Sequence, residues 1–326
     1  MKSVLFLLAI ALIGAAAWVL GPREQVAGPV DFDPEDIDAD VDRYLFRTER
    51  ETPGLNRGAQ KQVLWATPAR KRKTPLAIVY VHGFSASLQE IRPVPDLLAR
   101  QLGANLFYTR LTGHARDGAA LARAGALDWR ADMAEALEIG RRIGEKVIVI
   151  GTSMGGALAT LAMTDPALSR DVGGVVLISP AYRFRESGSG LLTWPFARSF
   201  VPMVAGKERF FVPHTPEHGK WWTTRYPTEA VIPVAALAKA AREAPLDRVR
   251  APALFLFSDS DTVVDPRETR RAAARWGGRA TVVPVETGPE DDPDHHVIAG
   301  EILSPGRTEP TVASILDWLS ESGLQE

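Results

Sequence analysis

Short, almost continuous apolar runs alternate with longer amphipathic segments along most of this chain. The apolar runs predict strands at residues 62–66, 76–81, 105–111, 146–150, 174–178, 253–257 and 281–285. Helices are predicted between them, for example at 88–102 and 128–144, and a final helix is predicted around 312–319. Strands that lack polar alternation, each followed by a helix, are typical of a parallel sheet with helices on both faces. The pattern therefore predicts an α/β fold with a mostly parallel sheet.

The alternation stops between residues 182 and 248, where aromatic residues and prolines gather. The aromatic residues include Trp194, Phe196, Phe200, Phe210, Phe211, Trp221, Trp222 and Tyr226. This stretch falls between two predicted strands at the carboxyl edge of the sheet, where loops commonly build binding sites. We expect it to form a lid. As a group its aromatic side chains are equally suited to contacting a substrate and to forming the lid's own core, and core packing is expected for any single one.

An uncharged apolar run covers residues 4–20. As a helix it would be ~25 Å long, at the short end of what crosses a bilayer. We expect residues 1–22 to be an uncleaved signal anchor, that is, a transmembrane helix; the alternative is a signal peptide cleaved after Ala15-Ala16-Ala17. Lys2 favours a cytoplasmic N-terminus. The rest of the chain would then lie on the extracytoplasmic side of the membrane, which is the periplasm in a bacterium, or would be secreted after cleavage.

Residues 23–59 are predicted to be an acidic tether. The acidic side chains are Asp31, Asp33, Glu35, Asp36, Asp38, Asp40 and Asp42. A calcium-binding EF-hand loop starting at Asp31 would need glycine and glutamate where Asp36 and Asp42 stand. A solvated linker is therefore expected rather than a metal site, and a single domain is expected over 60–322.

Composition excludes several classes of function. The 326 residues are 45% hydrophobic and 24% charged, which is ordinary for a globular protein with a large core. A net charge of -2 supplies no basic field for nucleic acid. The chain has no cysteine, so disulfides, a thiol nucleophile and cysteine-based zinc sites are excluded. His214 and His218 have a metal-like spacing, but Pro213 and Pro216 oppose the helix that would align them, so no metal is expected.

One short motif carries the strongest chemical signal. Gly151-Thr152-Ser153-Met154-Gly155 stands between the predicted strand at 146–150 and a small-residue helix. A G-x-S-x-G at such a junction forms a nucleophile elbow, a sharp turn that lifts the serine hydroxyl clear of the sheet. The motif alone is weak in a chain with 27 glycines, and an ordinary turn is the alternative. Its flanking elements make Ser153 the expected nucleophile.

Ser153 needs a histidine to take its proton and a carboxylate to orient that histidine. Asp261, just beyond the strand at 253–257, is the expected carboxylate. Asp259 and Asp265 are its competitors, although Asp265 precedes Pro266 as a helix cap would.

Two adjacent histidines compete for the role of general base. Neighbouring side chains point in different directions, so only one readily faces Ser153. His296 is favoured over His295 because the apolar pair Val297-Ile298 holds it at the rim of a core, whereas His295 adjoins an acidic turn.

Acyl transfer also needs donors for the negative charge that develops on the carbonyl oxygen. The backbone N–H groups of Met154, at a helix start, and Phe84, in the loop after the strand at 76–81, are the expected oxyanion hole. His82 and His114 are expected to order loops.

Five segments together resemble the α/β-hydrolase superfamily, closest to its monoacylglycerol lipase and carboxylesterase-like branch, which overlaps the S33 serine aminopeptidase-like group. The segments are 81–84, 110–114, 151–156, 258–264 and 296–298. The resemblance implies an α/β-hydrolase fold over about 60–322 and a catalytic histidine directly before a Val-Ile pair. Ser258 departs from the glycine usual in the acid segment, and 182–248 matches nothing usable, so substrate choice is not implied.

These features predict a serine hydrolase that cleaves carboxylic esters through an acyl-enzyme, with water as the second nucleophile and no cofactor. The expected substrate is a small ester with an apolar acyl group of short to medium length. The alternatives are an S33-like serine peptidase and a catalytically silent, membrane-tethered α/β-hydrolase-fold binding protein.

Overall fold

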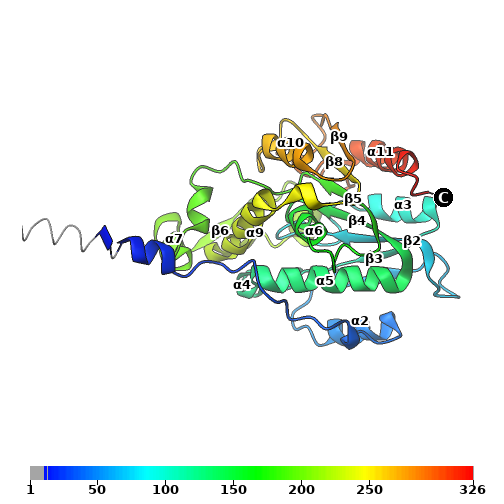
Figure 1. The fold of residues 1–326 in the computed structure, drawn as a ribbon, viewed down its shortest axis with the longest axis horizontal. Helices are drawn as coiled ribbons and strands as arrows, with labels where there is room; N and C mark the ends of the chain where they lie inside the picture. The colour runs from blue at the N-terminus through cyan, green and yellow to red at the C-terminus, as the bar shows by residue number, and fades with distance from the viewer. Residues whose placement is uncertain (1–10, 13, 326) are drawn as a thin grey trace, which may run out of the picture.

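A seven-stranded sheet forms the centre of the molecule in the computed structural model, which describes residues 11–12 and 14–325 (Figure 1). Its order is β1-β3-β2-β4-β5-β8-β9, and all neighbours are parallel except β1 and β3. The strands are β1 Gln62–Leu64, β2 Thr74–Val81, β3 Asn105–Tyr108, β4 Gly144–Thr152, β5 Val172–Ile178, β8 Ala253–Phe257 and β9 Ala280–Pro284. The predicted α/β fold with a mostly parallel sheet is confirmed.

Helices cover both faces of this sheet, and each face has its own core. One layer contains α5 (Ala126–Ile143), α6 (Met154–Met163), α9 (Val231–Glu243) and α10 (Pro266–Arg275). The other contains α3 (Val94–Leu102) and α11 (Thr308–Glu321). Along β2, Val79 packs into the first core while Ile78 and Tyr80 pack into the second. Both faces of the central strands are thus apolar, which explains their continuous hydrophobic runs.

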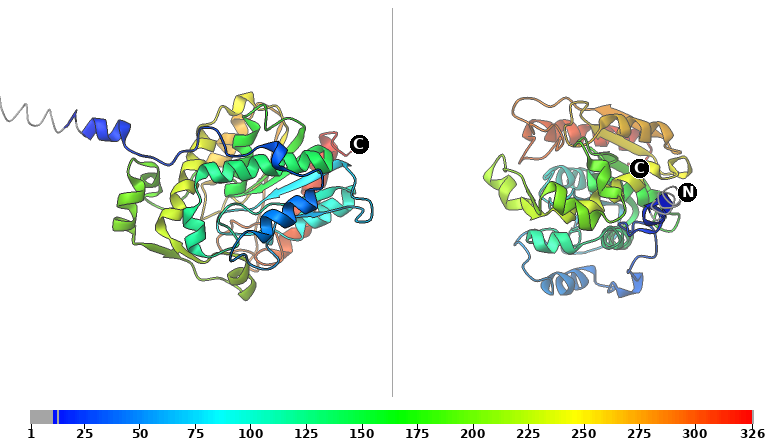
Figure 2. Two further views of the ribbon diagram at one scale, coloured as in Figure 1. Left: turned by 90° about the horizontal axis from the view of Figure 1, so that it is seen from below. Right: turned by 90° about the vertical axis from the view of Figure 1, so that its left-hand side faces the viewer.

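The stretch 182–248, hereafter the insertion, leaves the sheet after β5 and returns before β8. Besides α9 it contains α7 (Ala197–Ala205), α8 (Pro216–Trp221), the β6–β7 hairpin (Glu208–Phe210 and Arg225–Pro227) and the short 3-10 helices η2 (Ser189–Thr193), η3 (Thr228–Ala230) and η4 (Leu246–Arg248). Figures 1 and 2 show α7 and β6 projecting beyond one end of the sheet. α4 (Gly118–Arg123) contacts the hairpin from the main body.

The acidic stretch predicted to be a solvated tether packs against the domain instead. It forms a 3-10 helix, η1 (Pro34–Asp36), and an α-helix, α2 (Val41–Arg50). Ile37, Val41 and Leu45 are buried in the core on the α5 side of the sheet. Arg142 of α5 also donates to the carbonyl of Ile37 at 2.8 Å. The expectation of a free linker is wrong here because apolar residues at helical spacing lie hidden among the acidic ones.

Half of the predicted membrane anchor (residues 1–22) lies outside the described residues, which omit 1–10 and 13. Among the residues that are described, no helix is both long and apolar enough to cross a membrane. Residues 14–20 are helical, and Trp18 packs edge-on against Trp194 of the insertion with ring centroids 5.0 Å apart. The backbone N–H of Phe196 donates to the Pro22 carbonyl at 2.7 Å. This segment and the insertion are therefore neighbours (Figure 2).

Candidate active site

Ser153 occupies a sharp turn between β4 and α6. Its φ of 52° lies in the left-handed region that a serine rarely adopts. The turn is fixed by a hydrogen bond from its N–H to the Ile178 carbonyl at 2.9 Å. A Cβ on Gly155 would stand 2.1 Å from the Val81 carbonyl oxygen, so only glycine lets α6 begin this close to β2. The sequence motif and the local geometry are those of a nucleophile elbow.

The Ser153 hydroxyl is the first member of a chain of two hydrogen bonds. Its Oγ lies 2.9 Å from His296 Nε2, and His296 Nδ1 lies 2.7 Å from Asp261 Oδ2. All three residues are buried. An ionised carboxylate only accepts hydrogen bonds, so Nδ1 carries a proton toward Asp261. In neutral imidazole Nε2 is then free to accept the serine proton.

Backbone contacts hold Asp261 in this orientation. Its Oδ1 accepts hydrogen bonds from the N–H groups of Val263 and Val264 at 2.8 and 2.9 Å, while Oδ2 faces His296. The rival carboxylates lie elsewhere: Asp259 pairs with Arg270 at the surface, and Asp265 caps α10. The structure thus brings Asp261, and neither rival, next to the histidine.

The loop before His296 turns the two adjacent histidines apart. Asp292 Oδ2 accepts from the backbone N–H groups of His296 and Val297 at 3.0 and 2.8 Å. His295 has a φ of 54°, and its Nδ1 hydrogen-bonds to the Thr287 hydroxyl rather than to Ser153. Asp292 is a residue that the sequence did not reveal, because it stands among acidic neighbours that predict only a solvated turn.

Charge around His296 favours its protonated form. Burial by itself would lower the imidazole pKa. The charge of Asp261, its hydrogen bond to the ring and the charges of Asp292 and Glu90 together outweigh burial and raise the pKa of His296 to about 9. The surroundings therefore stabilise the imidazolium that forms when the histidine takes a proton.

The two predicted oxyanion donors flank Ser153. Met154 is the first residue of α6, where backbone N–H groups lack partners within the helix. Phe84 follows Gly83, and a Cβ on Gly83 would stand 3.2 Å from the Ser153 Cβ, so this loop lies against the serine. His82 orders the loop: Nε2 accepts from the Leu111 N–H at 3.1 Å, leaving Nδ1 to donate to the Gly83 carbonyl at 2.8 Å. Burial lowers the pKa of His82 to about 4, which keeps it neutral in this role.

A cavity of about 450 Å³ opens beside Ser153 and His296. Much of its lining is apolar and comes from the insertion; aromatic members are Phe84, Phe184, Phe211, Trp222 and Tyr226. Of the aromatic residues predicted for the lid, Phe211, Trp222 and Tyr226 line the cavity, whereas Trp194, Phe196 and Phe210 are exposed at the surface. Phe200 and Trp221 do neither and are partly buried against hydrophobic cores. The group is thus divided among cavity, core and surface, and Phe184 is an additional cavity residue.

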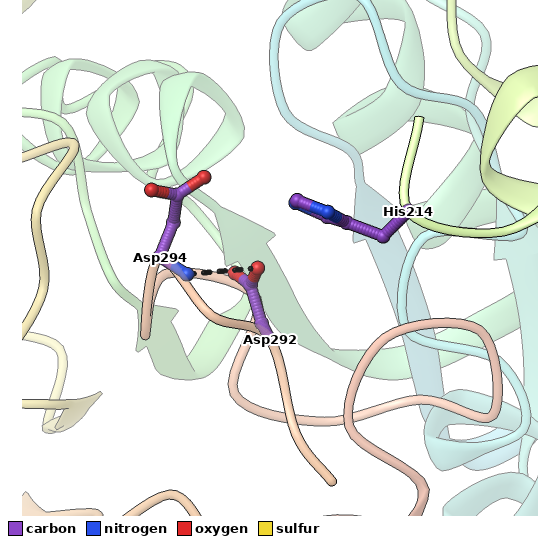
Figure 3. Close-up of side chains that lie close together, drawn as sticks. All are labelled: His214, Asp292 and Asp294. Atoms are coloured by element: carbon purple, nitrogen blue, oxygen red, sulfur yellow. Dashed lines mark hydrogen bonds between the residues drawn. The ribbon is translucent and has the colours of Figure 1, made fainter. Parts of the chain in front are cut away.

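A second cluster of side chains lies at the edge of this cavity. Figure 3 shows His214 of the insertion facing Asp292 and Asp294, with one ligand atom of each within 4.8 Å of the others. Such a group resembles a metal site in spacing. The Asp292 oxygens, however, already accept the backbone N–H groups of Asp294, His296 and Val297. These bonds explain the buried carboxylate without a metal, and none is assigned.

A mostly parallel sheet, with a serine in the turn after β4 that is hydrogen-bonded to a histidine and through it to an aspartate from beyond β8, is typical of α/β-hydrolases. A family model described as the alpha/beta hydrolase family matches residues 78–300, and the chain belongs to this family.

Similar proteins include lipases and esterases. The chain is 27% identical over 202 residues to a thermostable monoacylglycerol lipase of Bacillus sp. (strain H-257), a match covering 62% of this chain and 76% of that protein. In fold it is similar to a structure from work on the metagenome-derived lipolytic enzymes LipS and LipT, with a TM-score of 0.67, 23% identity and coverage of 82% of this chain and 99% of the other. A soluble variant of monoglyceride lipase from Saccharomyces cerevisiae gives a TM-score of 0.60 at 11% identity, over 81% and 92% of the two chains. The resemblance to the monoacylglycerol lipase and esterase branch is confirmed, and the chain is a lipase- or esterase-like α/β-hydrolase.

Proposed function

We propose that this protein is a serine hydrolase of carboxylic esters, acting through Ser153, His296 and Asp261. The observation that carries the proposal is the pair of hydrogen bonds, 2.9 and 2.7 Å long, that links the three side chains. This is the geometry that a proton transfer from serine to histidine requires. The family membership and the lipase relatives support the same reaction class.

The proposed reaction has two halves. His296 Nε2 takes the Ser153 proton as Oγ attacks the ester carbonyl. The Phe84 and Met154 N–H groups donate hydrogen bonds to the carbonyl oxygen and stabilise its negative charge. The histidine then gives its proton to the departing alcohol, leaving an acyl-enzyme. Water, deprotonated by His296, releases the acid and restores the serine. These steps need no cofactor.

The most direct test is labelling with a fluorophosphonate. Folded wild-type protein is expected to be labelled at Ser153, and Ser153→Ala is expected not to react. Absence of labelling in folded wild type would favour the silent binding protein. Equal or faster turnover of amino-acyl amides than of esters would favour the S33-like peptidase.

The cavity lining supports an apolar acyl group of short to medium length as the substrate. Phe211 lines the cavity, whereas its neighbour Phe210 points to solvent and is 66% exposed. Loss of one buried aromatic contact is worth about 1.5–3 kcal/mol. We therefore expect Phe211→Ala to lower kcat/KM for the best p-nitrophenyl ester of a chain-length series by roughly tenfold or more, while Phe210→Ala leaves it unchanged. Equal effects of the two variants would show that Phe211 does not contact the acyl group.

We also propose that residues 1–22 attach the protein to a membrane, with the catalytic domain on the extracytoplasmic side; a secreted form after cleavage is the alternative. The apolar run at 4–20 is the main support. The exposed apolar side chains of the insertion add to it, because α7 and the β6 region lie at the same end of the molecule as the N-terminal helix (Figure 2). The exposed apolar residues of the insertion are Trp194, Phe196, Met203, Val204, Phe210 and Val212.

A further inference from the structure

One buried carboxyl beside the site has no part in the reaction described so far. Glu90 lies in the loop between β2 and α3, is 2% exposed and lines the catalytic cavity. Its Oε2 accepts two hydrogen bonds, from the Gly83 N–H and from the Tyr80 hydroxyl, both at 2.7 Å. Burying a carboxyl is costly unless it is hydrogen-bonded. These two bonds therefore explain how Glu90 is accommodated at this position.

The contact with Gly83 places Glu90 next to the nucleophile. A Cβ on Gly83 would stand 2.6 Å from Glu90 Oε1 and 3.2 Å from the Ser153 Cβ. Gly83 thus lies against both the carboxyl and the serine. A larger residue there would have to displace one of the two side chains.

Gly83 is held from both sides. Glu90 binds its N–H, and His82 Nδ1 binds its carbonyl at 2.8 Å. That carbonyl shares a planar peptide unit with the Phe84 N–H, so fixing Gly83 also fixes the direction of the Phe84 donor. Oxyanion donors act only when they are aimed in advance at the position where charge develops.

We propose that Glu90 is a positioning residue: its carboxyl holds the Gly83 N–H and thereby aims the Phe84 N–H at the developing oxyanion. This inference rests on the proposed ester hydrolysis. Glu90 is then the hydrogen-bond acceptor that orders the loop after β2. It acts through Gly83 and does not touch the reacting atoms.

Glu90 also acts on the histidine through its charge. Burial raises the pKa of Glu90 to about 7, while the bonds from Tyr80 and Gly83 and the charge of His296 oppose the rise. In turn Glu90 is, with Asp261 and Asp292, one of the carboxylates that raise the pKa of His296. Removing its charge should lower that pKa, so neutral imidazole persists to lower pH. A purely structural role for Glu90 would not change the pKa of His296, so the pH profile of kcat/KM tests the role of its charge.

The experiment compares kcat, KM and the pH profile of kcat/KM in wild type, Glu90→Gln and Glu90→Leu. Glutamine keeps an oxygen for both donors, so kcat should stay within about fivefold of wild type, whereas leucine leaves Gly83 unheld and should lower kcat by about 10–100-fold with little change in KM. In both variants the rising limb of the pH profile should move to lower pH. Asp96→Asn is the matched control: Asp96 is a carboxyl of α3 that binds the Tyr108 hydroxyl away from the cavity, and its variant should change neither readout.

Wild-type kcat in folded Glu90→Leu would overturn the proposal, as would a loss in Glu90→Gln as large as in Glu90→Leu. If the leucine variant does not fold, Glu90→Asp replaces it. Aspartate keeps the charge, but its side chain is one methylene shorter, so its carboxylate lies farther from the Gly83 N–H. Wild-type kcat in folded Glu90→Asp would then overturn the proposal. Failure of the proposed function is distinguishable, since wild type itself would then neither hydrolyse esters nor react with a fluorophosphonate.

Discussion

At the scale of single residues, the geometry gives two adjacent histidines different surroundings. His296 lies between Ser153 and Asp261, whereas His295 binds Thr287. Members of a triad act as a unit, so removing the nucleophile or the base alone costs about as much as removing all three. We expect His296→Ala to lower kcat by several orders of magnitude, close to Ser153→Ala, and His295→Ala to cost far less. Steady-state kinetics on folded variants check this, and the reverse ranking would move the general base to His295.

The same histidine sets the expected pH dependence. Burial alone would lower the pKa of His296, but Asp261, Asp292 and Glu90 together outweigh burial and raise this pKa to about 9. The proposed base must be neutral to accept the serine proton, so kcat/KM should be low below this pKa and rise as pH increases through it. We expect the midpoint of the rise above the ordinary imidazole value of about 6.5. Rates at constant ionic strength measure it, over a range in which the protein stays folded. A midpoint at or below 6.5 would contradict the assigned role of the carboxylates.

At the scale of elements, α2 differs most from its sequence-based prediction. Leu45 of this helix is buried in the core on the α5 side of the sheet, while its neighbour Phe46 is 67% exposed. Truncating a buried leucine to alanine typically costs about 2–5 kcal/mol of stability, whereas a surface change costs about 0.5 kcal/mol or less. We expect Leu45→Ala to lower the denaturant midpoint of unfolding clearly and Phe46→Ala to leave it nearly unchanged. Equal midpoints for both variants would show that α2 does not contribute to the core and behaves as a loose tether.

The elements that could be predicted are those whose signal is local. β4 contains a continuous apolar run at 147–150, and the G-x-S-x-G after that run needs its glycines for a close approach between strand and helix. Glu90 and Asp292 could not be predicted in the same way. Both are acidic residues in turns, a pattern that usually indicates solvent exposure. Only burial and their backbone partners, which depend on the assembled fold, reveal them as parts of the site.

At the scale of the whole molecule, the insertion and the N-terminal helix lie at one end (Figures 1 and 2). Arg198 of α7 pairs with Glu24 at 2.6 Å, next to the contact between Trp18 and Trp194. The insertion lines the catalytic cavity as well, so an anchor in residues 1–22 would hold the insertion near the membrane surface. An apolar substrate would then have a short path from the lipid to Ser153.

Two kinds of membrane attachment are compatible with this arrangement, and salt distinguishes them. Charged side chains of the insertion, such as Arg198 and Lys207, would bind headgroups in a way that salt weakens. About 17 apolar residues inserted into lipid would resist salt and yield only to detergent. We expect the full chain to sediment with membranes, to remain there in high salt and to be released by detergent with the proposed esterase activity intact. Release by salt alone would indicate attachment by charge, and a soluble mature form beginning near Trp18 or later would show that residues 1–22 act as a cleaved signal.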